Sequence, residues 1–365
     1  MTHLSSFVLL FMVNLIQPQQ EVVLRESICE SCRILFDTIL TVDRTTPAPL
    51  SDQAVVAVGP QQEAYVLDPV QQPGLMLVYD RLGQIVGRID IRRIVQPGRP
   101  VVDRNGRVLI PDERTGELFP AESGGALGKP YLTVDHPHWI AFLSNGRVVL
   151  NALSAELNRT RYALHTLVLG DTLVSSFDRY TGRVLSSSES SKMWRRVWPQ
   201  DENRIWSAHV AEYKVDRWSL SGGRLTLAES FVRNPSWFKV RSGPVPAARV
   251  TSPPSSIRGI VADSAGLLWV VIRVADQNWR PFEVPEDPDG MGGTYYGFNR
   301  HLRKTVYDTI VEVIDPTRAV VIARRRLDTD LSTVVGPGYV IEYAAEDNDL
   351  GKYHVVRMRI AGMER

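Results

Sequence analysis

The sequence contains none of the short motifs that mark the commonest catalytic centres. It has no G-x-S-x-G nucleophile elbow, no phosphate-binding P-loop, no dinucleotide-binding glycine fingerprint and no H-E-x-x-H zinc motif. Almost no stretch repeats its apolar residues at helical spacing, and no run is long enough for a transmembrane helix. These absences argue against the best-known enzyme classes, against an α-helical fold and against a chain that crosses a membrane by helices.

A surplus of charge of one sign is also missing. The net charge is +1, from 42 basic and 41 acidic residues, so nothing points to nucleic acid as a partner. Lysine is scarce: only six of the basic residues are lysine, and the rest are arginine. An arginine surplus can serve carboxylate or phosphate recognition through the forked donors of the side chain, or it can reflect codon usage alone.

Cysteine occurs at only two positions, Cys29 and Cys32, in the sequence C-E-S-C. A zinc site would need two more ligands, and no second C-x-x-C or H-x-x-x-H supplies them. A redox pair would need a thioredoxin-like βαβ context, of which the sequence has no sign. Export would favour the third state, a disulfide between Cys29 and Cys32.

The amino terminus begins with an apolar run over residues 7–16. Its length suits the h-region of a signal peptide and is too short to span a bilayer. No lysine or arginine precedes it, and residues 17–20 are not an A-x-A cleavage site, so a buried first strand is the alternative. We expect residues 1–20 to be a signal peptide, which would place the protein outside the cytoplasm, in the periplasm or secreted.

From residue 33 onward, short apolar segments alternate with turn residues. The clearest unit is 257–273, where the turn D-S-A-G separates two β-branched segments and predicts a hairpin. The pattern returns at 100–110 with the turn D-R-N-G, and at 139–153 around an Asn-Gly pair. A four-stranded meander over 54–89 has the length of one propeller blade.

The number of such units predicts six four-stranded blades. Residues 332–360 supply only three strands, and residues 34–42 form one strand without a blade of its own. The N-terminal strand would therefore complete the last blade and close the ring, which removes exposed sheet edges. Two β-sandwiches are the alternative, but the even spacing favours an all-β, six-bladed β-propeller. We expect residues 33–365 to form this single domain, after an N-terminal segment, 21–32, that carries the C-x-x-C.

Several stretches resemble one family. The D-x-x-G turn followed by L-W-V, the segment I-D-P-T-x-x-V-V, and the ending Y-V-I-E-Y … Y-H-V-V-R-M-R-I resemble bacterial exported six-bladed β-propeller proteins of the NHL and TolB-like type. The resemblance covers nearly the whole chain. It implies blades and export, and it carries no catalytic motif to this sequence.

The connection over residues 275–305 is far longer than a propeller blade needs. Loops longer than roughly 12–15 residues are uncommon without a role, and this one mixes aromatic residues with arginine, both enriched at binding hot spots. A decorative insertion that packs on the ring is the alternative. The predicted binding residues of this loop are Trp279, Arg280, Phe282, Tyr295, Tyr296 and Arg300.

A second cluster combines tryptophan and arginine at Trp194 and Arg196. Such a pair can bind an anion or a sugar by stacking and by cation–π contact. Propeller cores also use tryptophan simply for packing. Both interpretations remain open at this stage.

Two short stretches are candidates for a divalent metal. His136 and His138 would lie on the same face of an extended segment and could offer two imidazoles, although a polar turn is the alternative. Asp287 and Asp289 resemble a calcium loop but match no EF-hand spacing, so a solvated acidic turn is the alternative. No cofactor is predicted; calcium or zinc would be the metal at these positions.

Our leading hypothesis is a non-catalytic extracytoplasmic propeller, a monomer, that binds a protein, peptide or glycan on the face that carries residues 275–305. The rival is a metal-dependent hydrolase or lyase with a site in the central channel, because propellers of the gluconolactonase type use a buried divalent ion. The sequence offers four candidates for such a channel site, which are Glu63, Asp112, His209 and Asp263.

Overall fold

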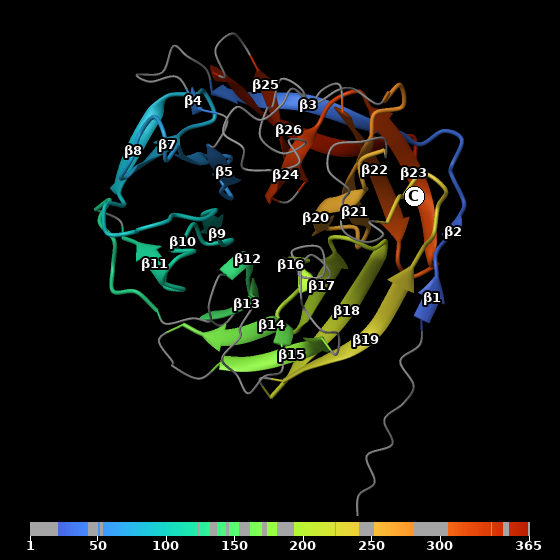
Figure 1. Cartoon of the computed structure of the whole chain (residues 1–365), viewed down its shortest axis with the longest axis horizontal. Helices are drawn as coiled ribbons and strands as arrows, with labels where there is room; N and C mark the ends of the chain where they lie inside the picture. Colours follow the sequence, from blue (N-terminus) through green and yellow to red (C-terminus); the bar gives the residue numbers. More distant parts are fainter. Residues whose placement is uncertain are drawn as a thin grey trace, which may run out of the picture.

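Six small β-sheets are arranged around a central axis in the computed structural model of the chain (Figure 1). In each sheet the first strand lies nearest the axis and the last lies at the rim. This confirms the predicted six-bladed β-propeller. The structure describes residues 21–42, 50–51, 54–122, 124–131, 137–143, 146–152, 161–169, 174–180, 193–222, 224–240, 252–280, 306–336, 338–345 and 350–363. Within these ranges no helix is long and apolar enough to cross a membrane.

The blades follow one another in chain order, and runs of β-branched and aliphatic residues form their strands. Blades 1 and 2 contain β5 (Val55–Val58), β6 (Ala64–Leu67), β7 (Leu75–Tyr79) and β8 (Ile85–Asp90), then β9 (Val101–Val102), β10 (Val108–Pro111) and β11 (Leu118–Ala121). Blades 3 and 4 contain β12 (Pro137–Phe142), β13 (Arg147–Ala152), β14 (Arg161–Val168) and β15 (Val174–Tyr180), then β16 (Arg195–Pro199), β17 (Arg204–His209), β18 (Lys214–Ser221) and β19 (Arg224–Val232). Blades 5 and 6 contain β20 (Ser256–Ala262), β21 (Leu268–Ala275), β22 (Tyr307–Asp315) and β23 (Val320–Leu327), then β24 (Leu331–Gly336), β25 (Tyr339–Ala345) and β26 (Leu350–Ala361).

The ring is closed by the strand that the sequence left without a blade. β3 (Arg33–Val42) pairs antiparallel with β26, from Ile34 opposite Ile360 to Val42 opposite Tyr353, and so completes blade 6. The two-residue strand β4 (Leu50–Ser51) pairs with the start of β26. The first and last parts of the chain therefore belong to the same sheet, as predicted.

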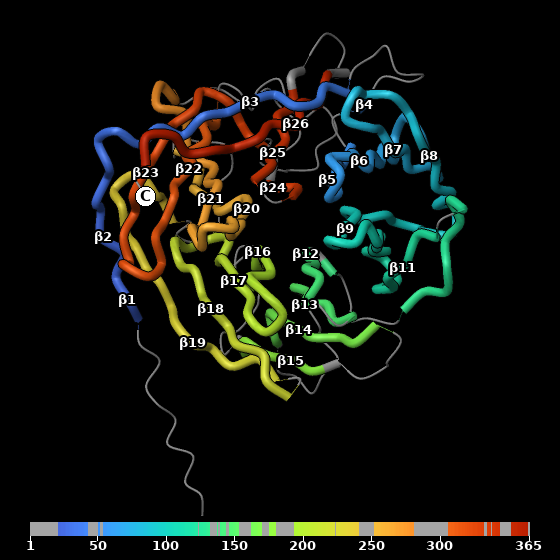
Figure 2. Tube along the Cα trace, turned by 180° about the vertical axis from the view of Figure 1, so that it is seen from behind, coloured from blue at the N-terminus to red at the C-terminus, as the bar shows by residue number. Residues whose placement is uncertain are grey.

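The N-terminal segment also extends two other blades, which the sequence did not predict. β1 (Glu21–Val23) pairs parallel with β19 of blade 4, and β2 (Arg25–Glu26) pairs parallel with β23 of blade 5. In Figure 2 this segment follows the rim of both blades before it enters blade 6. The segment covers sheet edges that would otherwise be open.

The disulfide between Cys29 and Cys32 is present, with 5.2 Å between the two Cα atoms, so that prediction is confirmed. The Cys29 amide donates a hydrogen bond to the Ile322 carbonyl in blade 5. The hydroxyl of Ser31, inside the bridged turn, donates to the carbonyl of Gly362 at 2.7 Å. The bridged turn thus joins the N-terminal segment to blade 5 and to the C-terminal residues.

The connections gather on two faces of the ring because neighbouring strands are antiparallel. The turn face carries the turns between first and second strands and between third and fourth strands. The loop face carries the connections between second and third strands and those between blades. The D-x-x-G turns lie on the turn face, and the carboxylates of Asp80, Asp103 and Asp263 each accept two backbone N–H groups within their own turn. The last residue of each turn has a φ of 78° to 80°, which glycine adopts without strain: Gly83, Gly106 and Gly266.

Six separate apolar clusters fill the six interfaces between neighbouring blades. Trp206, which is 1% exposed, belongs to the cluster between blades 4 and 5. Leu40 and Val42 of β3 belong to the cluster between blades 6 and 1. Each cluster is complete only when both of its blades are in place, so the stability of every blade depends on its two neighbours.

A buried ion-pair network joins blade 4, blade 5 and the N-terminal segment. The carboxylate of Glu312, which is fully buried, accepts hydrogen bonds from the Tyr213 hydroxyl, from Arg233 and from Arg324. Glu26 of β2 accepts hydrogen bonds from the same two arginines. Burial and then the Glu312 charge raise the pKa of Tyr213, while the hydrogen bond from Arg324 lowers the pKa of Glu26. The network places four charges between the two blades.

His165 of β14 gives a prediction for acid stability. Its side chain is fully buried, with Nδ1 2.9 Å from the Ser176 hydroxyl, and burial lowers the pKa of His165 to about 4 from an ordinary value of 6.5. Because the unfolded chain then binds more protons than the folded one, stability falls as pH drops from 6.5 to 4, by about 3 kcal/mol from this group. Urea unfolding measures the free energy of unfolding at pH 7 and at pH 4. Between these two pH values we expect His165→Gln to lose about 3 kcal/mol less of this free energy than the unaltered protein loses. Ser176→Ala keeps the imidazole, so its free energy of unfolding should fall with acid as much as that of the unaltered protein. If the free energy of His165→Gln falls by the same amount, His165 is not the group responsible.

Candidate functional site

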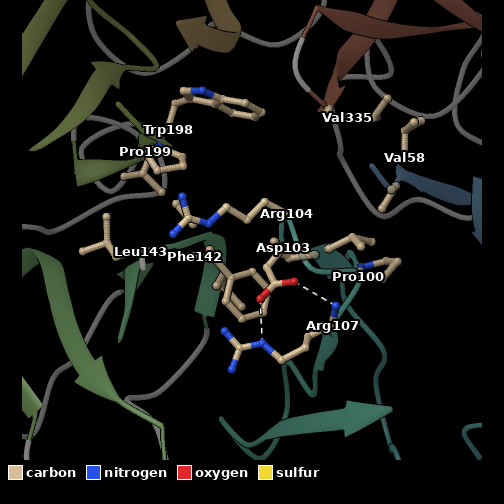
Figure 3. A pocket seen from close by; sticks show the side chains of 18 of the residues that line it. Val58, Pro100, Asp103, Arg104, Arg107, Phe142, Leu143, Trp198, Pro199 and Val335 are labelled. Atoms are coloured by element: carbon tan, nitrogen blue, oxygen red, sulfur yellow. Dashed lines mark hydrogen bonds and ion pairs between the residues drawn. The ribbon is translucent and has the colours of Figure 1, made fainter. Parts of the chain in front are cut away.

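A cavity of about 360 Å³ occupies the central channel (Figure 3). Five of the six blades line it, and they present the ends of their first strands and the turns that follow. One residue from each shows the arrangement: Val58, Pro100, Phe142, Trp198 and Val335. A volume of this size lies at the lower end of the usual range for small-molecule pockets, roughly 300–1,000 Å³.

The mouth of the cavity lies on the turn face and carries both charges and apolar groups. The exposed side chains of Arg104 and Glu202 form an ion pair at 3.6 Å, and Figure 3 shows Arg104 extending toward Pro199. In the same turn, the half-exposed Arg107 side chain donates a hydrogen bond from Nε to the buried Asp103 at 2.6 Å. The hydrogen-bond partners of Asp103 therefore lie within its own turn. The side chain of Arg104 extends across the mouth of the cavity.

Farther into the channel, two arginines lie against one indole ring. The Cζ atom of Arg196 lies 4.5 Å from the centre of the Trp139 ring, and that of Arg99 lies 5.0 Å from it. The Trp139 Nε1 donates to the Val197 carbonyl at 3.0 Å, which fixes the ring between blades 3 and 4. Arg99 and Trp139 line the cavity. We call Arg99, Trp139 and Arg196 the arginine–tryptophan cluster.

Strand alternation explains how Arg196 reaches this position. Its neighbours in β16, Arg195 and Val197, are buried, and Val197 packs in the cluster between blades 3 and 4. Alternate residues of a strand point to opposite faces, so Arg196 points away from that core.

The charges of the cluster are unusual for their surroundings. Burial, followed by the nearby positive charges of Arg99 and Arg273, lowers the pKa of Arg196 to about 9. Burial also lowers the pKa of Arg99 to about 10, against the opposing effect of Glu113. Both guanidinium groups remain charged at neutral pH, and the charge of Glu113 acts on Arg99. Cation–π contacts with Trp139 stabilise these charges in part.

The structure describes four of the eight predicted binding residues. Trp194 immediately precedes β16 and Arg196 lies within it, so one member of this pair belongs to the cluster in the channel. Trp279 is half-buried and Arg280 is exposed, both just beyond the end of β21 on the loop face. The others fall outside the described residues, and their binding role stays a prediction: Phe282, Tyr295, Tyr296 and Arg300.

The four residues named for a channel enzyme do not converge. Glu63 and Asp263 lie in turns of the turn face, whereas Asp112 and His209 lie at the loop-face ends of second strands. Each has a local role: Glu63 accepts the Gln61 N–H, and Asp263 accepts two N–H groups of its turn and the Trp269 Nε1. The Asp112 carboxylate accepts hydrogen bonds from four backbone N–H groups. Burial has the largest single effect on the pKa of Asp112 and raises it, but the four hydrogen bonds together lower this pKa below its ordinary value.

His209 has a partner that the sequence did not reveal. Its Nε2 lies 2.9 Å from one oxygen of the Asp216 carboxylate. The other oxygen of that carboxylate accepts a hydrogen bond from the Ser230 hydroxyl. Burial, followed by the charge of Arg195, lowers the pKa of His209. The three side chains come from consecutive strands of blade 4, so this contact is internal to one sheet.

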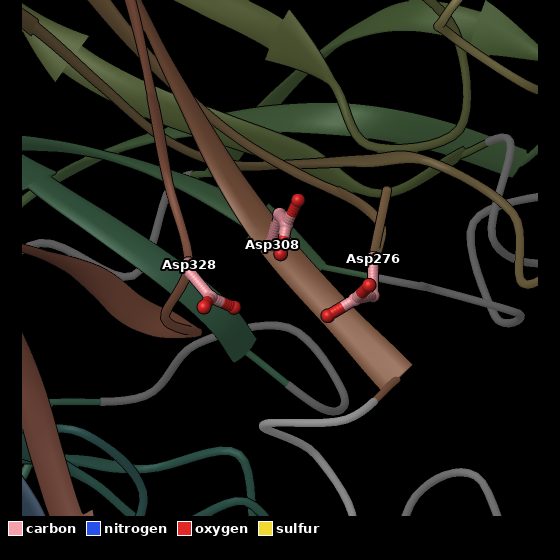
Figure 4. Close-up of side chains that lie close together, drawn as sticks. All are labelled: Asp276, Asp308 and Asp328. Carbon is pink, nitrogen blue, oxygen red and sulfur yellow. The ribbon is translucent and has the colours of Figure 1, made fainter. Parts of the chain in front are cut away.

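The predicted metal ligands lie outside the described side chains, since His136, Asp287 and Asp289 are not described and only the backbone of His138 is. A different acidic group is present at the loop face of blade 5, where Asp276, Asp308 and Asp328 bring oxygens within 4.8 Å of one another (Figure 4). Carboxylate oxygens are the ligands that calcium prefers. However, Asp308 already accepts a hydrogen bond from Arg326 at 2.5 Å, so the guanidinium of Arg326 balances one of the three negative charges.

Sequence reasoning missed Arg99 and Trp139. Arg99 lies in a proline- and glycine-containing connection, and Trp139 reads as an ordinary strand residue. Neither position carries a local signal, because the two residues meet Arg196 only through the packing of blades 2, 3 and 4.

Comparison with known proteins shows likeness of fold only. No protein-family model matches the sequence, and no curated protein sequence matches it. Many solved structures are similar to the structure of this chain. One is a member of the DUF4221 family from Bacteroides vulgatus, with 11% identity over 91% of this chain and 99% of that one, at a TM-score of 0.52. A Bacteroides fragilis protein, provisionally described as exported, has 9% identity over 93% of this chain and 100% of that one, at a TM-score of 0.55.

A gluconolactonase from Xanthomonas campestris is similar at a lower level, with 12% identity over 94% of this chain and 99% of that one, at a TM-score of 0.47. A likeness at that level says nothing about activity. The two higher-scoring structures support the fold alone, and they say nothing of repeat type or ligand.

Proposed function

We propose that the protein is a non-catalytic, extracytoplasmic β-propeller, active as a monomer, that binds part of a protein, peptide or glycan in its central cavity. The observation that carries this proposal is the cavity itself, which combines apolar walls with a few charged groups in the manner of ligand sites. The dispersal of Glu63, Asp112, His209 and Asp263 over two faces supports binding over a metal-dependent hydrolase or lyase built from those residues.

The proposed location has independent support. The Cys29–Cys32 disulfide and the likeness to a protein described as exported are compatible with a site outside the cytoplasm. Removal of residues 1–20 as a signal peptide is part of the same proposal.

Filling the cavity should abolish binding. Val335 of β24 lines the cavity and is half-buried at the edge of the cluster between blades 6 and 1, so Val335→Trp can place an indole in the opening. Val23, 67% exposed at the rim of blade 4, provides the matched control Val23→Trp. We expect a defined array of peptides and glycans, both charged and neutral, to contain binders that the control variant retains and that Val335→Trp loses by at least tenfold.

Thermal unfolding of both variants would first establish that the ring remains folded. An array without any binder, or binders that both variants retain equally, would reject the cavity as the binding site.

A further inference from the structure

One arginine in the channel has no counter-charge. Neither an ion pair nor a hydrogen bond involves the Arg196 guanidinium within the described part of the chain, and its Nε is buried without an acceptor. Other arginines whose side chains are mostly buried are paired: Arg195 with Asp178 at 2.8 Å, Arg273 with Asp330 at 2.5 Å, and Arg233 with Glu312. Arg196, whose side chain is half-buried, therefore lacks the carboxylate partner that these three arginines have.

Such an arrangement is costly unless something compensates for it. A charge removed from water without a partner destabilises the folded state, and here Arg99 and Arg273 lie near enough to lower the pKa of Arg196 further. The contact with Trp139 offsets only part of this cost. An anion in the channel would supply the missing charge and accept hydrogen bonds from the guanidinium.

The cluster lies where a ligand in the cavity would reach it. Arg99 and Trp139 form part of the cavity lining, and Arg196 contacts the Trp139 ring. Guanidinium groups offer paired N–H donors that match the oxygens of carboxylate, phosphate and sulfate groups. The geometry thus places two such groups on one aromatic platform at the inner end of the cavity.

We propose that the arginine–tryptophan cluster is an anion subsite, and that it holds the acidic group of a glycan whose sugar ring occupies the cavity. This deepens the proposed function and rests on it. The wall offers flat apolar faces for a sugar ring at Trp198 and Pro199. A peptide carboxylate is more often held in a nest of backbone N–H groups, whereas the donors here are arginine side chains.

The first test uses inorganic sulfate and phosphate against chloride at constant ionic strength. We expect both oxyanions to raise the melting temperature of the unaltered protein, and Arg196→Gln to remove most of that rise. The matched control is Arg92→Gln, a surface arginine whose side chain is 80% exposed; it corrects for the general stabilisation that sulfate gives to proteins. Equal responses in Arg196→Gln and Arg92→Gln would overturn the subsite.

A second readout needs no ligand. In anion-poor buffer Arg196→Gln should melt at a higher temperature than the unaltered protein, because it removes a desolvated charge. A purely structural arginine would give the opposite sign, so a lower melting temperature would also overturn the proposal.

The third test identifies the ligand class by isothermal titration. The probes are tetragalacturonic acid and its methyl ester, and acetyl-dialanine with its amide. We expect only the acidic glycan to bind, and Arg196→Gln to weaken it on the order of ten- to hundredfold, as for the loss of a charged hydrogen bond. Arg196-dependent binding of the peptide acid alone would reject the glycan assignment. Cavity-dependent binding of neutral ligands that Arg196→Gln retains would reject the subsite and leave the proposed function intact.

Discussion

A chain that begins at residue 43 should fail to form a stable monomer. The deletion removes β3, so β26 loses its outer antiparallel partner from Tyr353 to Ala361 and becomes an open edge there. It also removes Ile34, Leu40 and Val42, which are at most 5% exposed and belong to two interblade clusters. At roughly 1.5–3 kcal/mol for each buried side chain, the three contribute about 5–9 kcal/mol, comparable with the whole stability of a typical domain.

The shorter deletion of residues 1–20 is the matched control, because β1 to β3 remain in place. We expect it to unfold at the same temperature as the full chain, while the longer deletion elutes as aggregate in size-exclusion chromatography. A synthetic peptide of residues 21–42 should restore part of the monomer by adding the missing strand. A longer deletion that is monomeric and melts like the full chain would show that closure by β3 contributes little.

Replacing Glu312 by alanine should lower the free energy of unfolding by about 3–5 kcal/mol, the usual cost of removing one partner from a buried ion pair. The change leaves Arg233 and Arg324 between blades 4 and 5 with only Glu26, and leaves the Tyr213 hydroxyl without its acceptor. Urea unfolding of the purified variant measures the loss. None of the hydrogen-bond partners that Glu312 has in the described residues lines the cavity, so we expect its contribution to be to the ring.

Two comparisons separate charge from packing. Glu26→Ala removes the exposed carboxylate of the same network, whose side chain is 52% exposed, and should cost less than about 1 kcal/mol. A triple variant, Glu312→Leu with Arg233→Met and Arg324→Leu, should recover much of the loss, because apolar replacements of buried ion pairs are often neutral or better. Equal losses in Glu312→Ala and the triple variant would show that shape, and not uncompensated charge, explains the effect.

The parts of the fold that could be predicted are those whose causes lie within a few residues. The turns at 80–83, 103–106 and 263–266 form because an aspartate accepts the N–H groups that follow it and a glycine takes a positive φ. The closing strand was predicted by counting strands, since residues 34–42 form a strand without a blade and residues 332–360 supply only three of the four strands that a blade needs. The rim strands β1 and β2 were missed because two or three residues are too few to show alternation.

The candidate site shows the opposite case. Arg196 could be named because a tryptophan and an arginine stand close together in the sequence, but its contact is Trp139 and not Trp194. The proposed channel carboxylates could be named by residue type, yet both aspartates accept backbone N–H groups. Asp263 accepts them within its own turn, and Asp112 accepts them from its own loop and from Val95 in the preceding connection. Residue type alone does not distinguish a carboxylate that stabilises a turn from one that faces a ligand.

By itself the sequence determined the strand class, the turns, the pairing of Cys29 with Cys32 and the closure of the ring, because these follow from local alternation, turn chemistry and strand count. Only the tertiary structure decided that Arg99, Trp139 and Arg196 share one site. They come from three blades, and their meeting depends on how six sheets pack around one axis, a sum of interblade contacts that no short stretch of sequence records.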